Sequence, residues 1–365
     1  MAQIRIENVR KEFGAFTAVQ GSTFTVEDGE FFMLLGPSGC GKTTTLRMMA
    51  GLELPTSGCI YLGGEEVGQK PASQRDIAFV FQMFALYPHM NVRRNMAYPL
   101  VSQGMPRADV RAKVEEVARI LGIVDILDRP VGGLSAGDRQ RVALGRAIVR
   151  EPKCFLMDEP LGALDAEFRE HMAGELRALH DRMGATTVYV THDQIEAMQM
   201  GDRIVVMNHG VVEQFGRPQE IYDWPATMFV ASFIGSPAMN FLPFEGVAAP
   251  GASSLRIGEV EIGIPDLREG ARGRLALGVR PEHIRLDDAA PYRARVAATE
   301  YLGTTQIVTL DTAHGAVKAR LASTEPIAVG ATTGLRLDAR TLSVFEAERG
   351  RALASAANEK VLRHG

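Results

Sequence analysis

The stretch that decides the fold is FFMLLGPSGCGKTT, which runs from Phe31 to Thr44. Its apolar part, Phe31 to Leu35, is typical of a strand that is buried on both faces of a sheet. The glycine-rich part, Gly36 to Thr43, matches the phosphate-loop pattern G-x-x-x-x-G-K-S/T, and the residues after it have a helical period. Because a phosphate loop lies between a strand and a helix, this order favours a genuine loop over a chance match.

The residue types in this loop suit the binding of phosphate groups. Glycines let the backbone approach closely, while successive N–H groups and the helix N-terminus donate hydrogen bonds to phosphate oxygens. Lys42 can neutralise charge, and Thr43 can bind magnesium. We therefore expect a nucleotide to contact Gly36, Pro37, Ser38, Gly39, Cys40, Gly41, Lys42, Thr43 and Thr44.

Two carboxylates follow a second apolar run. The segment CFLMDEP, from Cys154 to Pro160, places Asp158 and Glu159 at the end of a buried strand, where an open α/β sheet binds its ligands. Asp158 suits magnesium, and Glu159 suits a base that activates water. An acidic pair after a strand is more often a solvated strand end or a helix cap, but the phosphate loop upstream favours the catalytic interpretation.

The remaining patterns predict an α/β fold followed by a β domain. Further buried strands are expected at IAFVF (77–81) and TTVYV (186–190), and alternating strands at 4–9 and 22–26. We predict a nucleotide-binding domain over 1–235 with a helical subdomain at about 88–150, and an all-β domain with a terminal tail over 236–365.

Composition disfavours several classes of protein. The net charge of -4 and a pI near 6.1 disfavour nucleic acid as a partner. Three scattered cysteines, Cys40, Cys59 and Cys154, favour a reducing compartment over a disulfide framework. The opening MAQIRIENVR lacks the layout of a signal peptide, and no apolar run is long enough to span a bilayer, so we expect a cytoplasmic chain.

Several further motifs resemble those of ABC ATPases, in the family's order. LSAGDRQRVALGRA (134–147) resembles the signature segment, and Gln82, Asp165 and His192 match the glutamine loop, the D-loop and the switch histidine. Phe13 lies at the aromatic position that stacks on adenine, and Ala18 at a small apolar position after it. The resemblance covers roughly residues 3 to 235 and implies a P-loop NTPase fold of the ABC type.

This resemblance also implies roles for individual residues. Two subunits would dimerise head to tail with ATP and Mg2+ between them, and Ser135 and Gly137 would contact the γ-phosphate from the partner subunit. Phe13, Ala18, Gln82 and Asp165 would also bind the nucleotide. The catalytic residues would be Lys42, Glu159 and His192, and the metal ligands Thr43, Gln82 and Asp158.

The signature departs from the family at two positions. Ala136 replaces the first glycine of the usual pair, and Asp138 replaces the glutamine. A methyl group can crowd the backbone approach, and a carboxylate brings negative charge toward phosphate while suiting a helix N-terminus. We therefore hypothesise reduced ATPase activity or a mixed dimer with an intact partner subunit. A regulatory subunit that binds ATP but hydrolyses little of it is the alternative.

Four segments resemble the maltose and glycerol-phosphate type of importer ATPase: ALYPHM (85–90), GSPAMNF (235–241), GVRPEHIRL (278–286) and ATEYLGTTQIVTLD (298–311). The last two resemble a small OB-like barrel. This likeness implies two permease subunits, a solute-binding protein outside the membrane, and a peripheral position on its cytoplasmic face. The solute would be a sugar, a polyol or a glycerol-phosphate-like compound, although polyamine and iron importers share the layout.

Two questions about partners stay open. Phe84, Leu86, Tyr87 and Met90 would line a cleft for a permease coupling helix, or else would pack inside the helical subdomain. The OB-like barrel could bind an oligonucleotide, but residues 245–275 contain no aromatic platform, which favours regulation or dimer contact. A soluble ABC ATPase of repair or translation is disfavoured because the chain has one phosphate loop and a short insert.

Overall fold

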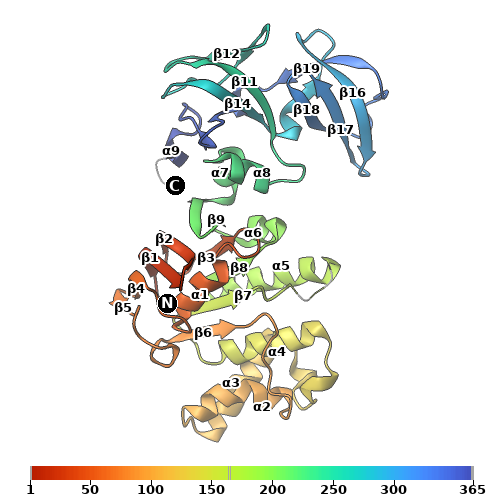
Figure 1. Ribbon diagram of the computed structural model, residues 1–365. Coiled ribbons are helices and arrows are strands. Elements are labelled where there is room, and N and C mark those ends of the chain that lie inside the picture. Colours follow the sequence, from red (N-terminus) through yellow and green to blue (C-terminus); the bar gives the residue numbers. More distant parts are fainter. Residues whose placement is uncertain (1, 163, 165, 363–365) are drawn as a thin grey trace. The chain divides into compact units, whose positions relative to one another are not determined.

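The computed structural model describes residues 2–162, 164 and 166–362. The chain forms two compact units, Met1–Val212 and Glu213–Gly365, and each is described by itself (Figure 1). Within the described residues, no helix combines the length and apolar character needed to cross a membrane.

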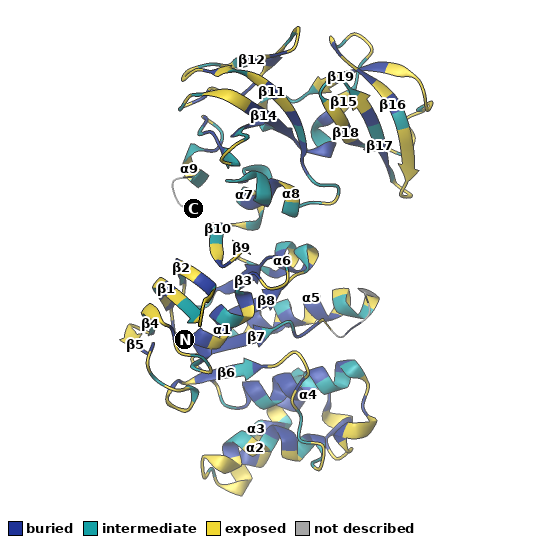
Figure 2. Ribbon diagram, viewed as in Figure 1, coloured by how far each residue is buried: buried dark blue, intermediate teal, exposed yellow. Residues whose placement is uncertain are grey.

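The first unit is built on a sheet whose strand order is β10-β9-β3-β8-β7-β6. Its neighbouring pairs from β9 to β6 are parallel, and the central strand β3 is buried along its whole length, as the apolar run predicts (Figure 2). The strands are β3 (Phe31–Leu35), β6 (Ile77–Val80), β7 (Cys154–Asp158), β8 (Thr186–Thr191), β9 (Arg203–Asn208) and β10 (Val211–Gly216), which carries the chain into the second unit.

A smaller antiparallel sheet in the same unit has the order β2-β1-β4-β5. The alternating patterns near the N-terminus predict such a layer, although the strands are longer than predicted. They are β1 (Ile4–Phe13), β2 (Phe16–Val26), β4 (Ser57–Leu62) and β5 (Glu65–Glu66).

Helices complete the unit. The segment predicted to be a helical subdomain contains three helices, which bury apolar side chains such as Met96, Val114 and Leu144. The helices of this unit are α1 (Lys42–Ala50), α2 (Val92–Ser102), α3 (Arg107–Ile120), α4 (Ala136–Ile148), α5 (Ala166–Met183) and α6 (Gln194–Met200).

A buried arginine fixes the C-terminal end of α1. Arg75 is 3% exposed and donates hydrogen bonds to the carbonyl oxygens of Met48 (2.6 Å) and Met49 (2.7 Å), and also to those of Lys70 and Gly68. Burial lowers the pKa of its guanidinium to about 10, so the group keeps its charge near neutral pH. A cation here adds hydrogen bonds to carbonyls in the last turn of the helix, where the helix dipole favours positive charge.

The second unit begins with α7 (Pro218–Asp223) and α8 (Met228–Phe233) and is otherwise almost all strand, as predicted. Its two larger sheets have the orders β11-β14-β20-β21 and β15-β19-β16-β17-β18, and their side chains share one core. The strands are β11 (Asn240–Ala248), β12 (Ser254–Ile257), β13 (Val260–Gly263), β14 (Ala271–Val279), β15 (Ile284–Leu286), β16 (Tyr292–Tyr301), β17 (Thr305–Thr312), β18 (Gly315–Ala322), β19 (Thr332–Leu337), β20 (Ser343–Glu346) and β21 (Arg351–Ala352). The tail ends in a short helix, α9 (Glu359–Leu362).

Arg280 joins the two short helices of this unit to the end of β14. Its side chain is 1% exposed and donates to the carbonyl oxygens of Tyr222 (2.7 Å), Ala231 (3.1 Å) and Ile234 (2.5 Å). The guanidinium also lies over the ring of Tyr222, 4.1 Å from its centroid. These bonds explain why residues 213–235, which the sequence analysis placed before its boundary at 235, belong to a compact unit with the β domain.

Replacing this arginine tests its structural role. We expect Arg280→Met to lower the free energy of unfolding of the second unit by about 3 kcal/mol or more, because several buried carbonyls lose their donor. The only tryptophan, Trp224, lies in this unit, so its fluorescence during urea unfolding reports the change. Arg340→Met is the control, since that side chain is 90% exposed. Equal midpoints for the two variants would contradict the role.

Candidate nucleotide site

The phosphate loop lies between β3 and α1, as the sequence predicts. Lys42 is 4% exposed, and its ammonium donates to the carbonyl oxygens of Gly36 (2.8 Å) and Pro37 (2.9 Å). These two bonds hold the charge over the loop, and the third donor of the ammonium has a long contact of 3.9 Å with Sγ of Cys40. The N-terminus of α1 adds its positive dipole at the same place.

Ala18 backs this loop. Gly41 is the N-cap of α1 with a φ of +104°, and a Cβ atom there would lie 2.6 Å from the carbonyl oxygen of Ala18. A side chain at this position would therefore collide with β2 and strain the backbone. The structure thus places Ala18, which the sequence analysis named for the small apolar position after Phe13, against the phosphate loop.

Asp158 stands at the end of β7 and meets the start of α1. Its Oδ1 accepts a hydrogen bond of 3.0 Å from the hydroxyl of Thr43. Burial raises the pKa of Asp158, and this effect outweighs the bond from Thr43, which lowers it. The two predicted metal ligands therefore lie together, although they come from distant parts of the sequence.

Glu159 is the centre of a second group. Its carboxylate lies 3.2 Å from Nδ1 of His192 and accepts a 3.3 Å hydrogen bond from the amide of Gln82. The side chain of Glu159 is 20% exposed and that of His192 53%, so water can reach both. Three residues predicted from separate motifs thus meet at one carboxylate.

The backbone of Glu159 is unusual. Its φ is +44°, in the left-handed region that favours glycine, and its N–H donates to the carbonyl oxygen of Val190 on β8. Its own carbonyl accepts from the N–H of Gly162. A strained conformation that neighbouring bonds hold in place is typical of functional sites.

The donor atoms suit magnesium. Thr43, Asp158 and Gln82 carry hydroxyl, carboxylate and amide oxygens, the hard ligands that this ion prefers. Within the described residues, no cluster of three or more His, Cys, Asp and Glu side chains could hold a metal without other ligands. This set fits an ion that takes the rest of its ligands from substrate phosphates and water, as Mg2+ usually does.

The hairpin between β1 and β2 presents two aromatic side chains. Phe13 and Phe16 are cross-strand partners, 48% and 62% exposed, so their rings project from the same face of the hairpin. The ammonium of Lys11 lies 4.7 Å from the centroid of the Phe13 ring. Phe13 was expected from the sequence and Phe16 was not, although the two-residue spacing Gly14–Ala15 of a hairpin turn could have revealed it.

The signature residues form the N-terminus of α4. Ser135 caps the helix by accepting from the N–H of Asp138 (3.1 Å), and its hydroxyl donates to Asp138 Oδ2 (2.8 Å). A Cβ atom at Gly137 would lie 2.2 Å from the ring of Phe168. Among the described residues, these signature residues contact α4 itself and Phe168 of α5, and Asp165 lies outside the described residues.

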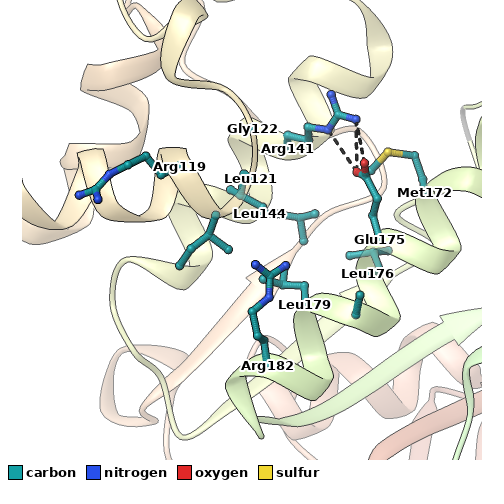
Figure 3. Close-up of a pocket in the computed structure, with 12 residues that line it drawn as sticks. Arg119, Leu121, Gly122, Arg141, Leu144, Met172, Glu175, Leu176, Leu179 and Arg182 are labelled. Atoms are coloured by element: carbon teal, nitrogen blue, oxygen red, sulfur yellow. Dashed lines mark hydrogen bonds and ion pairs between the residues drawn. The ribbon is translucent and has the colours of Figure 1, made fainter.

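A pocket of about 330 Å³ lies beside α4 and is lined by residues of α3, α4 and α5 (Figure 3). Figure 3 shows Arg141 at this pocket paired with Glu175, and the nearest distance is 3.2 Å. Arg141 also lies 3.7 Å from Asp138. None of the residues predicted to bind the nucleotide lines this pocket. Arg141 matters for the signature because its positive charge partly offsets the negative charge of Asp138.

A second hollow, of about 550 Å³, is lined by aromatic residues including Phe81, Tyr87 and Tyr98. Of the four residues predicted for a coupling cleft, Tyr87 lines this hollow. Phe84 is 8% exposed, which favours the alternative that this side chain packs inside the unit. Leu86 and Met90 are partly exposed but are not among the lining residues.

Arg146 of α4 fixes the segment beside this hollow. It donates to the carbonyl oxygens of Phe84 (2.9 Å) and Ala85 (2.7 Å), and its guanidinium lies 5.3 Å from the centroid of the Tyr87 ring. The segment is therefore attached to the helical subdomain.

Comparison with family models identifies three regions. A model described as ABC transporter matches residues 19–162. Models described as MalK OB fold domain and TOBE domain match residues 235–284 and 277–345.

Curated relatives match most of the chain. The trehalose import ATP-binding protein SugC of Mycobacterium tuberculosis is 44% identical, with 96% of this chain and 98% of the relative covered. The sn-glycerol-3-phosphate import ATP-binding protein UgpC of Ruegeria pomeroyi is 51% identical, with 84% and 86% covered. The trehalose/maltose import ATP-binding protein MalK of Thermococcus litoralis is 45% identical, with 97% and 100% covered.

Solved structures match the first unit's fold. The dimeric bacterial ABC transporter cassette MJ0796 is 30% identical with a TM-score of 0.54, and covers 59% of this chain and 98% of its own. The structure of cbiO1 from Clostridium perfringens is 26% identical with a TM-score of 0.57, and covers 60% and 89%.

The aromatic hairpin gives a prediction for base binding. We expect Phe13→Ala to raise the Kd for ATP about tenfold, since stacking of a base on an aromatic ring is worth about 1–3 kcal/mol. Phe16→Ala should act in the same direction. Inorganic tripolyphosphate, which has no base, should bind both variants as it binds the unchanged chain. Tyr301→Ala, which removes a 74% exposed ring from the second unit, is the control. Equal weakening of ATP and tripolyphosphate would exclude base stacking.

Proposed function

Because this chain belongs to the ATP-binding subunits of ABC transporters, we propose that it powers an importer for a sugar, a polyol or a glycerol-phosphate-like solute. The chain is an ATPase by this membership. The solute class is supported by the names of relatives that match nearly the whole chain, including the OB-like β domain. Importers of polyamines or iron are the alternative.

The meeting of Gln82 and His192 at the carboxylate of Glu159 carries the mechanistic proposal. In this mechanism Glu159 orients and polarises the attacking water, and His192 contacts the γ-phosphate. Lys42 neutralises charge on the β- and γ-phosphates from the loop. Thr43, Asp158 and Gln82 would hold Mg2+, which when bound neutralises charge that develops on the phosphate oxygens.

The second half of each site would come from another subunit. Ser135 and Gly137 of a partner, at the N-terminus of its α4, would face the γ-phosphate across a head-to-tail dimer, and Asp165 would also bind the nucleotide. The helix dipole there favours an anion. The capping bond of Ser135 to Asp138 occupies its hydroxyl hydrogen, so closing on ATP has to compete with this bond. A homodimer is therefore expected to work slowly, and a mixed dimer with an intact signature is the alternative.

Transport would be coupled through the aromatic hollow that Tyr87 lines. Its apolar and aromatic side chains suit a short helix of a permease. Two permeases and an external solute-binding protein would complete the system, with this chain peripheral on the cytoplasmic face. ATP can drive such a cycle only because it binds the closed dimer more tightly than the open one, and hydrolysis removes this difference in affinity.

Glu159→Gln tests the hydrolytic mechanism. We expect turnover to fall at least about 100-fold, because general-base catalysis contributes about 10²–10⁴. ATP binding should persist and trap a dimer, measured by mass photometry with and without ATP. Glu167→Gln, an exposed carboxylate on α5, is the control. Unchanged turnover in Glu159→Gln would remove Glu159 from the mechanism, and no turnover in the unchanged chain or with co-purified permeases would overturn the proposed function.

The altered signature gives a second prediction. The double substitution Ala136→Gly and Asp138→Gln should increase ATP turnover severalfold, because a charge near phosphate is removed while a glutamine can still complete the helix cap. The steady-state rate and the ATP-dependent dimer fraction are the measurements. Asp125→Asn, an exposed acidic residue of the helical subdomain, is the control. No increase over the unchanged chain would show that the natural signature is already competent.

A further inference from the structure

The pairing of Glu159 with His192 joins two loops that follow different strands. Glu159 follows β7, and His192 follows β8. The distance of 3.2 Å between their side chains depends on where each loop is held, because a side chain can be placed no better than its backbone.

Arg169, on the first turns of α5, contacts both loops. Its Nη1 donates to Oδ2 of Asp193 at 3.2 Å, next in the chain after His192. Its Nη2 donates to the carbonyl oxygen of Leu164 at 3.0 Å, in the loop after Glu159. The side chain is 27% exposed, so these bonds are partly shielded from water.

These contacts close a ring. From the Glu159 side chain the ring passes to His192, along the chain to Asp193, and through Arg169 to Leu164. Leu164 is 6% exposed, and its N–H donates to Leu161. The N–H of Gly162 donates back to the carbonyl of Glu159, which completes the circuit.

The His192 side of the ring is anchored on a buried polar group. Thr191 accepts from the N–H of Asp193 and donates to Glu196 at 2.7 Å, while Tyr189 donates to the same carboxylate oxygen at 3.0 Å. Asp193 in turn caps α6. Glu196 Oε1 lies 3.7 Å from Nε of Arg169, so the charge of the arginine also faces this carboxylate. Buried and mutually bonded groups of this kind have one arrangement.

We propose that Arg169 is a positioning residue for ATP hydrolysis, which closes this ring and thereby sets the distance between Glu159 and His192. The inference rests on the proposed function, because it takes Glu159 and His192 as the groups that act on water and γ-phosphate. Arg169 itself touches neither. A planar guanidinium can bind two acceptors in fixed directions, which an ammonium cannot reproduce.

Arg177 provides a matched control on the same helix. Its guanidinium donates to the carbonyl of Met200 at 2.7 Å and to Asp202 at 2.9 Å, at the other end of α6, and its side chain is 30% exposed. It therefore joins α5 to the end of α6 with the same types of bond, but outside the ring.

The test compares Arg169→Gln, Arg169→Lys and Arg177→Gln in the full chain, or in the transporter complex if the chain alone is inactive. We expect Arg169→Gln to lower kcat roughly 10- to 100-fold, since small misplacements of reacting groups cost about that much, with KM for ATP and the Kd of a fluorescent ATP analogue unchanged. The loss of kcat in Arg169→Lys should be smaller than that in Arg169→Gln. Arg177→Gln should keep the kcat of the unchanged chain, even if its Tm falls as far as that of Arg169→Gln.

A double-substitution cycle shows whether Arg169 acts through Glu159. Adding Arg169→Gln to Glu159→Gln should reduce the residual rate by less than twofold, because the group that it positions is already gone. Additive losses in the cycle, a kcat equal to that of the unchanged chain, or equal kcat losses in Arg169→Gln and Arg177→Gln would each overturn the inference. By contrast, absence of ATP hydrolysis in the unchanged complex would overturn the proposed function itself.

Discussion

The parallel alignment of β3, β8 and β7 is the constraint on which the site depends. Leu35 of β3 pairs with Thr191 of β8, and Val190 of β8 pairs with Asp158 of β7. Because the strands run in the same direction, their carboxyl ends meet at one edge of the sheet. The phosphate loop, the acidic pair and His192 are therefore neighbours although more than a hundred residues separate the first from the others.

Much of this arrangement could be predicted from the sequence. Continuous apolar runs identify the buried strands, and motifs placed after them identify Lys42, Asp158 and Glu159, because ligand positions in such sheets follow from strand ends. The left-handed backbone of Glu159 could not be predicted, since a glutamate gives no indication of a positive φ. It is held by a tertiary hydrogen bond, in which the N–H of Glu159 donates to Val190 of β8, and by a local turn at Gly162.

Other features of the structure also differ from, or add to, what the sequence predicted, because they depend on contacts that the local sequence does not show. For Phe84 the sequence left open a docking surface or internal packing, because local pattern does not distinguish a ring that faces outward from one that packs inward, and the side chain is buried. Gly137 was expected to serve a phosphate of another subunit, and the structure adds a second reason for glycine there, the ring of Phe168 in its own chain. Arg169 was missed because it carries no motif and because it joins a nearby carbonyl, that of Leu164, to a carboxylate far along the chain, that of Asp193.

The capping of α1 by Arg75 has a mechanical consequence. Arg75 lies directly before β6, whose far end leads to Gln82, so the helix behind the phosphates and the strand before the glutamine form one body. Beyond Gln82, Arg146 ties Phe84 and Ala85 to α4. Any rotation of the helical subdomain on this side is therefore confined to the three-residue hinge Phe81–Met83. The central residue of this hinge, Gln82, is the one whose side chain contacts Glu159.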